Sequence, residues 1–192
     1  MITGAAKRLG KAMALSLAER GYDIIIHCNR SSLEAVQLQH EIEKQGRSAW
    51  VVSADLSQAD LSEFFSGVLA LQKPIHLLVN SASVFIPSTF EQSDSQLLDL
   101  HWQVNCRAPY LISQWFAQNF STGHIVNMTD CIEHNERYFP YMLSKTALTS
   151  LTMMLAKSLA PSIRVNAIAP GWILDPPGDD AKTFPVEYVR DS

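Results

Sequence analysis

Residues 123–145 read GHIVNMTDCIEHNERYFPYMLSK, and the rest of the chain is organised around this stretch. Residues 124–128 form an apolar run typical of a buried strand, the polar Asp130 follows, and a helix is predicted to begin at Tyr141. Lys145 lies four residues after Tyr141, which places the phenol and the ammonium on one face of that helix. A positive charge beside a phenol lowers its pKa, so we expect Tyr141 to act as a general acid near neutral pH. The same spacing also occurs in pairs of solvated side chains on helix surfaces, so the rest of the chain must show whether this pair is catalytic.

Strands and helices alternate on both sides of this stretch. Short apolar runs that predict parallel strands follow a first strand ending at Ile2 and Thr3, and they lie at 24–28, 49–53, 75–79, 124–128 and 164–169. Helices are expected at 11–20, 31–44, 60–71, 95–120 and 141–159, the second of them capped by a Ser31-x-x-Glu34 capping box. This alternation predicts a doubly wound parallel sheet, that is, one Rossmann-like α/β domain over residues 1–192. Residues 172–192 are Pro-containing and irregular, and we expect them to be the substrate-loop region.

The composition suits a compact globular domain and excludes several classes of function. Of 192 residues, 47% are hydrophobic, and the formal net charge is −4, so we expect no basic surface for nucleic acid or an anionic membrane. The longest apolar runs are too short to span a bilayer, and a cytoplasmic protein is expected. Cys28, Cys106 and Cys131 are widely spaced, which fits reduced thiols, and neither they nor the six histidines form the pattern of a metal site.

Polar and small residues follow nearly every predicted strand. The carboxyl ends of parallel strands meet at one edge of a sheet, and ligands of doubly wound folds bind at that edge, where the strand order reverses. The candidate site residues share this edge: Thr3 to Gly10, Asn29 and Arg30, Asp55, Asn80 to Ser83, Asp130, and Pro170 with Gly171.

Gly4 and Gly10 flank the turn between the first strand and the first helix. Gly4 permits a tight turn, Gly10 permits close packing of the helix, and the helix N-terminus offers N–H groups to a pyrophosphate, although such a glycine pair is also ordinary turn chemistry. Residues 29–31 read NRS, where an NAD site normally carries Asp or Glu. Arg8 and Arg30, unless they are merely solvated, predict a pocket for a 2′-phosphate, and NADP(H) is therefore favoured over NAD(H).

With these residues the chain resembles the short-chain dehydrogenase/reductase family, and within it the pteridine reductases of the dihydromonapterin or dihydrofolate reductase type. The matching motifs span nearly the whole chain in family order: TGAAKRLG (3–10), HCNRSS (27–32), ADL (54–56), NSAS with Phe85 and Pro87 (80–87), NCRAPY (105–110), YMLSK (141–145) and RVNAIAPG (164–171). The likeness to pteridine reductases depends on Arg8 in place of a glycine, on Arg30 with Ser31, on Phe85 and on Asp130.

The resemblance implies a role for each matching residue. The adenosine and phosphates would be held by Thr3, Gly4, Arg8, Leu9, Gly10, Asn29, Arg30 and Ser31, and the adenine by Asp55 and Leu56. The ribose and nicotinamide would be contacted by Asn80, Ala82, Ser83, Lys145, Pro170 and Gly171. Tyr141 would donate the proton, and Asn105 would interrupt its helix and fix a water in a proton relay to Lys145.

Asp130 and Phe85 bear on the substrate. Asp130 stands where most of the family carries a serine that bonds a carbonyl oxygen. A carboxylate there repels a developing oxyanion but suits proton delivery to an imine nitrogen, which favours reduction of C=N over C=O, unless Asp130 merely caps a turn. The loop between Asp130 and Tyr141 is shorter than in the family, so Met128 is an alternative occupant of the serine position. Phe85 is suited to stack on a flat heteroaromatic ring, unless it is a core aromatic.

The leading hypothesis is an NADPH-dependent reductase that converts a dihydropterin or dihydrofolate to its tetrahydro form, with no nucleic-acid or membrane partner. One alternative is a carbonyl-reducing member of the family, such as a 3-oxoacyl or sugar ketone reductase, and another is a non-catalytic NADP-binding fragment or subunit. The family implies a homo-dimer or homo-tetramer. Compared with the family, the chain is expected to lack part of the first strand and the C-terminal helix and strand.

Overall fold

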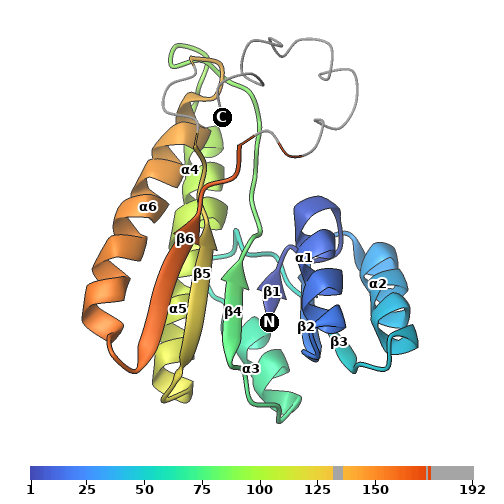
Figure 1. The fold of residues 1–192 in the computed structure, drawn as a ribbon. Helices are drawn as coiled ribbons and strands as arrows, with labels where there is room; N and C mark the ends of the chain where they lie inside the picture. Colours follow the sequence, from blue (N-terminus) through green and yellow to red (C-terminus); the bar gives the residue numbers. More distant parts are fainter. Residues whose placement is uncertain (132–135, 172, 174–192) are drawn as a thin grey trace.

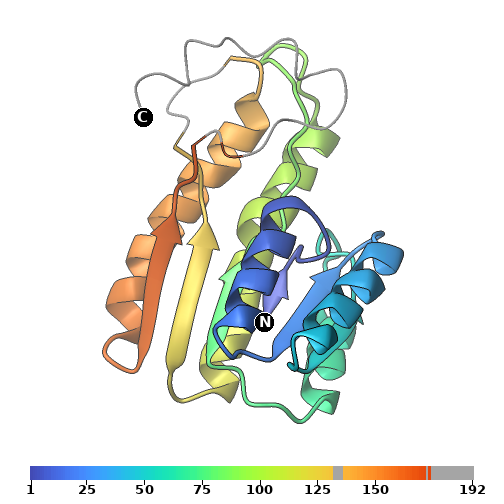
Figure 2. The same cartoon turned by 45° about the vertical axis from the view of Figure 1, so that its right-hand side comes forward.

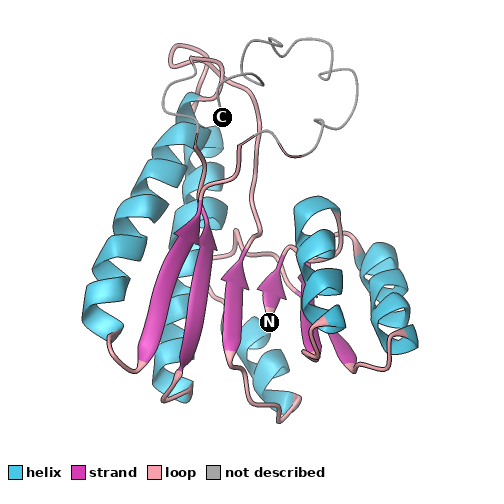
Figure 3. Ribbon diagram, viewed as in Figure 1, coloured by secondary structure: helices cyan, strands magenta, loops and turns pink. Residues whose placement is uncertain are grey.

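The computed structural model describes residues 1–131, 136–171 and 173, and a six-stranded parallel sheet runs through its centre (Figure 1). The strands are β1 (Ile2–Thr3), β2 (Ile24–Cys28), β3 (Ala49–Ser53), β4 (Leu77–Asn80), β5 (Gly123–Met128) and β6 (Ile163–Ile168). They lie in the order β3-β2-β1-β4-β5-β6, and all the arrows point the same way in Figure 3. The order reverses between β1 and β4, which confirms the predicted doubly wound, Rossmann-like α/β fold.

Helices cover both faces of the sheet. The first two, α1 (Arg8–Glu19) and α2 (Ser32–Lys44), lie on one face, while α4 (Ser95–Trp102), α5 (Ala108–Asn119) and α6 (Phe139–Leu159) lie on the other (Figure 2). A short α3 (Ser62–Ala70) follows β3, and a π-helical segment, η1 (Gln103–Arg107), joins α4 to α5. Within the described part of the chain, none of the helices has the length and apolarity needed to cross a membrane.

The core has two layers because successive residues of a strand point to opposite faces of the sheet. In β2, for example, Ile25 and Ile26 belong to different clusters. The cluster of Ile25 includes Phe64, Leu78, Ile112, Phe116 and Ile125, and that of Ile26 includes Ala14, Ala18, Leu38 and Ile42. Both layers lie below the carboxyl edge of the sheet and hold the strand ends in fixed positions.

The turn between β1 and α1 is packed too closely for side chains at its two glycines. Gly4 has φ +65°, and a Cβ there would lie 2.8 Å from the Cα of Ala82. A Cβ at Gly10 would lie 2.2 Å from the carbonyl oxygen of Gly4, so α1 rests directly on the turn. Arg8, with φ +50°, takes the left-handed conformation in the same turn. The expected roles of Gly4 in turning the chain and of Gly10 in helix packing are therefore met.

Three local predictions differ from the structure. The first helix begins at Arg8 rather than Lys11. The expected capping box does not form, because the Ser31 side chain makes no capping hydrogen bond and Glu34 pairs with Lys7 at 2.6 Å. The last helix begins at Phe139 rather than Tyr141, whereas the helical region predicted over residues 95–120 is interrupted by η1 as the resemblance implied for Asn105.

Candidate active site

The C-terminal end of β5 and the start of α6 bring three predicted site residues together. The Tyr141 hydroxyl donates a hydrogen bond to the Asp130 carboxylate. The Lys145 ammonium donates to the carbonyl oxygen of Met128 at 2.7 Å and lies 5.6 Å from the centre of the Tyr141 ring. Met128 therefore offers only its backbone, and the carboxylate beside the phenol is that of Asp130.

The phenol does not have the lowered pKa that the spacing of Tyr141 and Lys145 predicted. Burial raises the pKa of Tyr141, and the Asp130 carboxylate raises it further. Burial also lowers the pKa of Lys145 to about 8, an effect that Asp130 opposes. The prediction was wrong because the ammonium is turned toward a carbonyl oxygen while the phenol is shielded from water beside a negative charge. Tyr141 therefore holds its proton at neutral pH.

Asn105 lies inside η1, where the helix is interrupted as the resemblance implied. Its amide is fully buried and pairs with the backbone of Val84: the oxygen accepts from the Val84 N–H at 2.7 Å, and the nitrogen donates to the Val84 carbonyl at 2.9 Å. The nitrogen also donates to the Ser144 hydroxyl at 3.0 Å, and the Ser83 hydroxyl donates to the oxygen at 3.2 Å. Asn105 thus connects η1 with α6 and with the loop that follows β4.

Phe85 is not a core residue, since its side chain is 41% exposed. Its ring stacks on Tyr138, with centroids 4.3 Å apart and planes at 10°, and meets Tyr141 edge to face at 4.6 Å. The stacked rings of Phe85 and Tyr138, called here the aromatic wall, therefore lie beside the phenol of Tyr141, which bonds the Asp130 carboxylate.

The turn after β1 is joined to the segment after β4. The Thr3 hydroxyl oxygen accepts hydrogen bonds from the backbone N–H groups of Ser81 and Ala82, at 2.9 and 3.0 Å. At the start of α1, Lys7 makes no side-chain capping bond, and the first turn contains no acidic residue. Leu9 packs against the core cluster beneath α1. The helix N-terminus can therefore bind a pyrophosphate through its N–H groups.

The end of β2 fits a phosphorylated ribose. Asn29 and Arg30 are exposed, Ser31 is half-buried, and none of these three positions carries a carboxylate that would repel a 2′-phosphate. Asp55 accepts from the Ser57 N–H and hydroxyl at 3.0 and 2.8 Å. These bonds, more than the nearby charge of Arg30, hold the pKa of Asp55 below its usual value. Arg8 is exposed at the same edge of the sheet.

Only some of the other predicted residues lie at the carboxyl edge of the sheet. Leu56 is buried in the core, and the Asn80 amide donates to Asn127 at 2.8 Å and to Ser113 of α5 at 3.3 Å, so neither presents its side chain at the carboxyl edge. Pro170 is half-buried, and a Cβ at Gly171 would lie 3.7 Å from the Cys131 sulfur, which places Gly171 beside the residue after Asp130. Most of the predicted substrate-loop region lies outside the described residues.

Two buried histidines that the sequence did not single out hold backbone groups of this edge. His27 accepts from the Gly4 N–H at 3.1 Å, and its other ring nitrogen lies 3.1 Å from the carbonyl oxygen of Ala54. His101 accepts from the Ile86 N–H at 3.2 Å. The sequence signals were the place of His27 in the HCNRSS motif, which assigned it no role, and for His101 a histidine in an otherwise apolar helix. Among the described residues, no three His, Cys, Asp or Glu side chains gather as a metal site would require.

Comparison with known proteins gives consistent results. The family model described as short chain dehydrogenase matches residues 1–181. The solved structure of FolM alternative dihydrofolate reductase 1 from Brucella suis, in complex with NADP, is 39% identical, with a TM-score of 0.84 over 90% of this chain and 74% of that one. Pteridine reductase 1 of Leishmania tarentolae is 31% identical over 89% of this chain and 75% of its own length. L-xylulose reductase of Caenorhabditis elegans is also 31% identical, over 94% and 73% respectively.

Proposed function

The chain belongs to the short-chain dehydrogenase family, and we propose that within it the protein is an NADPH-dependent reductase of dihydropteridine-type substrates, a dihydropterin or dihydrofolate. The observation that carries the proposal is the hydrogen bond from the Tyr141 phenol to the Asp130 carboxylate, with the exposed ring of Phe85 beside it. The FolM and pteridine reductase relatives support it.

Two groups of residues at the carboxyl edge would bind the two halves of NADP(H). The N-terminus of α1 and the Gly4 turn would bind the pyrophosphate, while Arg30, Ser31 and Arg8 would bind the 2′-phosphate. The nicotinamide half would lie toward Ser83, Lys145 and Gly171. When bound, NADPH supplies the hydride. The FolM neighbour's complex with NADP supports this choice of cofactor.

Tyr141 is the proton donor in this proposal. The nitrogen of the substrate C=N bond would accept the phenolic proton of Tyr141, and its carbon the hydride that bound NADPH would supply, so that the double bond would become CH–NH. Tyr141 then regains a proton from solvent, a transfer that Asn105 and Lys145 assist. Because burial and Asp130 keep the phenol protonated, the proton is available until the substrate nitrogen replaces the carboxylate as its acceptor.

In this proposal the negative charge of Asp130 favours reduction of a C=N bond over a C=O bond. A carbonyl oxygen gains negative charge during reduction, and a carboxylate at hydrogen-bond distance from the phenol would repel it. An imine nitrogen ends the reaction as N–H, and a carboxylate can accept a hydrogen bond from that group or from a ring N–H of a pterin. Phe85 would stack on the flat ring, a contact worth about 0.5 to 1.5 kcal/mol beyond burial of area.

The test is NADPH oxidation with a panel of dihydropterins and ketones. We expect turnover of dihydrobiopterin or dihydrofolate, and in Asp130→Ser a loss of that turnover of at least about 100-fold with a gain toward ketones. Brisk turnover of a ketone by the wild type, with none of any dihydropterin, would establish the alternative of a carbonyl-reducing enzyme. The xylulose reductase relative, as similar as pteridine reductase 1, is the observation that favours this alternative.

We also propose a homo-dimer or homo-tetramer in the cytoplasm. Exposed apolar side chains lie on α4, α5 and α6: Leu98, Trp102, Tyr110, Leu143, Met153 and Met154. The three cysteines are free thiols, which suits a reducing compartment. Light scattering should show an oligomer that Met154→Glu dissociates, whereas Leu33→Glu on α2, at an equally exposed leucine, should not. A monomeric wild type would contradict this part of the proposal.

A further inference from the structure

We propose that His101 is a positioning residue that, together with Asn105, fixes the orientation of Phe85 in the substrate site. The inference deepens the proposed function, because it concerns how the site receives a flat heteroaromatic ring. It rests on the loop of residues 81–88, called here the Phe85 loop, and on the helical segment beneath it.

The hydrogen bonds of His101 define a single tautomer. The Nδ1 atom lies 2.9 Å from the carbonyl oxygen of Leu97, which can only accept, so Nδ1 carries the proton. The Nε2 atom is therefore unprotonated and accepts from the Ile86 N–H at 3.2 Å. The side chain is fully buried, and this burial lowers the pKa of His101, which favours the neutral ring. A buried, neutral imidazole in one tautomer is a rigid acceptor for the loop.

His101 and Asn105 hold the centre of the Phe85 loop, on either side of Phe85. They lie four residues apart, on one face of the segment formed by α4 and η1. Asn105 pairs with both backbone groups of Val84, at 2.7 and 2.9 Å, and His101 binds the N–H of Ile86. The two anchored residues flank Phe85 directly, so the direction of its side chain follows from these bonds.

Phe85 needs such anchoring because burial does not hold it. Its side chain is 41% exposed, and its described ring contacts are with Tyr138 and Tyr141. The His101 ring also meets the Tyr141 ring edge to face, with centroids 6.4 Å apart. A shift of the loop would therefore move the aromatic wall relative to the phenol and widen the space for a flat substrate.

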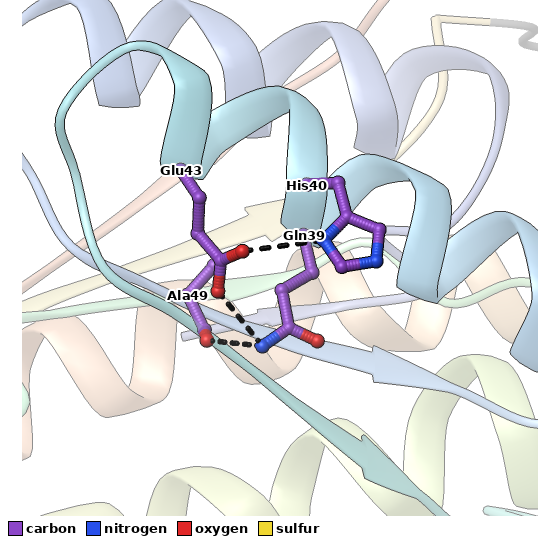
Figure 4. A network of polar contacts seen from close by, with 4 residues as sticks. All are labelled: Gln39, His40, Glu43 and Ala49. Atoms are coloured by element: carbon purple, nitrogen blue, oxygen red, sulfur yellow. Dashed lines mark hydrogen bonds and ion pairs between the residues drawn. The ribbon is translucent and has the colours of Figure 1, made fainter.

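Three variants separate the roles of His101. His101→Leu removes the acceptor for Ile86, whereas His101→Gln places an amide oxygen where Nε2 lies and can keep it. The matched control is His40→Leu on α2, because the His40 side chain is 65% exposed and interacts at 3.3 Å with Glu43 of the same helix (Figure 4). The Gln39 side chain donates to the Glu43 carboxylate and to the Ala49 carbonyl oxygen. These residues are far from the Phe85 loop in sequence.

The first readout, which needs no substrate, is hydrogen exchange at the backbone amide of Ile86, which donates to His101. We expect exchange to rise at least tenfold in His101→Leu, and to change less than threefold in His101→Gln and His40→Leu. Unchanged exchange in His101→Leu, in a protein that remains folded by circular dichroism, would overturn the proposal. If His101→Leu does not fold, the same comparison is made with His101→Asn, which keeps a donor for Leu97 and loses the acceptor for Ile86.

The second readout is a double-mutant cycle with Phe85→Ala on kcat/KM for dihydrobiopterin. If His101 acts through Phe85, the loss in His101→Leu should be about tenfold in the wild-type background and less than twofold in Phe85→Ala. The NADPH dissociation constant should stay within twofold. Additive losses, or weaker NADPH binding, would show a merely structural role. Absence of dihydropterin turnover in the wild type would contradict the proposed function, while the exchange measurement would still decide the role of His101.

Discussion

The phenol of Tyr141 donates a hydrogen bond to the carboxylate of Asp130, across the short loop between β5 and α6. One proton thus lies between two oxygens, in the site where we propose that a substrate nitrogen binds. Burial is the largest cause of both pKa shifts at this site: it raises the pKa of Tyr141 and lowers that of Lys145. The Asp130 carboxylate is the next cause, and it raises the pKa of both groups.

Replacing Tyr141 by Phe should remove the proton donor while keeping the aromatic contact with Phe85. We expect NADPH oxidation with dihydropterin to fall at least 100-fold, within the usual range of about 10²–10⁴ for general acid catalysis. NADPH binding, followed by fluorescence, should change less than twofold. Tyr110→Phe, at an exposed position of α5, is the control and should be fully active. Equal activity of the two variants would favour the non-catalytic alternative.

Lys145 should give the pH profile its alkaline limb. Its ammonium donates to the Met128 carbonyl, and its pKa is lowered to about 8 by burial. As pH rises through this value the charge is lost, so kcat/KM should fall by about tenfold per pH unit above it. The profile is measured from pH 6 to 10. Lys145→Arg keeps its charge over this range, and any activity that it retains should show no such decline. A flat wild-type profile up to pH 10 would contradict the assignment.

Arg30 should determine the preference for NADPH over NADH. It is exposed at the end of β2, where no carboxylate follows the strand. A hydrogen bond to a charged phosphate is worth about 1.5 to 3 kcal/mol, so Arg30→Ala should weaken NADPH binding by about 10- to 150-fold and leave NADH binding nearly unchanged. Calorimetry with both cofactors measures this. Arg20→Ala is the control, because Arg20 bonds only to Ser16 of its own helix in the described contacts. Equal losses for both cofactors would refute a 2′-phosphate pocket.

His27 should make the fold sensitive to acid. Burial lowers the pKa of His27 from 6.5 to about 4, so below pH 6.5 the unfolded chain binds a proton that the folded protein does not. Stability is therefore greatest above pH 6.5 and is lost as pH falls toward 4. For this one group we expect a loss of about 2 kcal/mol in the free energy of unfolding between pH 7.5 and 5.

Urea unfolding at both pH values tests the effect of His27. In His27→Gln the pH dependence should be smaller by that amount, because Gln does not titrate, while the exposed His40→Gln should behave as the wild type. An equal pH dependence in all three proteins would disprove the assignment.

The sequence predicted the sheet and its carboxyl edge because these depend on local patterns. Short apolar runs such as 24–28, bounded by turn residues, favour strands buried on both faces, and β2 has these bounds. The spacing of Tyr141 and Lys145 likewise placed them on one helix, α6. The resemblance placed Asp130 and Tyr141 in one site, and the structure joins the two by a hydrogen bond although a loop separates them in the chain.

What the sequence did not predict depends on partners brought in by the tertiary fold. The pKa of Tyr141 is raised rather than lowered because Lys145 bonds a strand carbonyl, which no spacing within a helix reveals. Glu34 pairs with Lys7 of the preceding turn instead of capping its own helix. His27 and His101 were not recognised because the groups that they bind, at Gly4 and Ile86, come from other segments.

The π-helical segment η1 contains one more residue per turn than the α-helices on either side of it. The wider turn absorbs this residue, so the faces of α4 and α5 keep the phase that one continuous α-helix of about 3.6 residues per turn would give them. Deleting one position from 103–107 would therefore leave Ile112 and Phe116 in the core, where they are now fully buried. What the deletion would remove is the wide turn that presents Asn105 to the site. The extra residue of η1 thus shapes the site without altering which face of α5 enters the core.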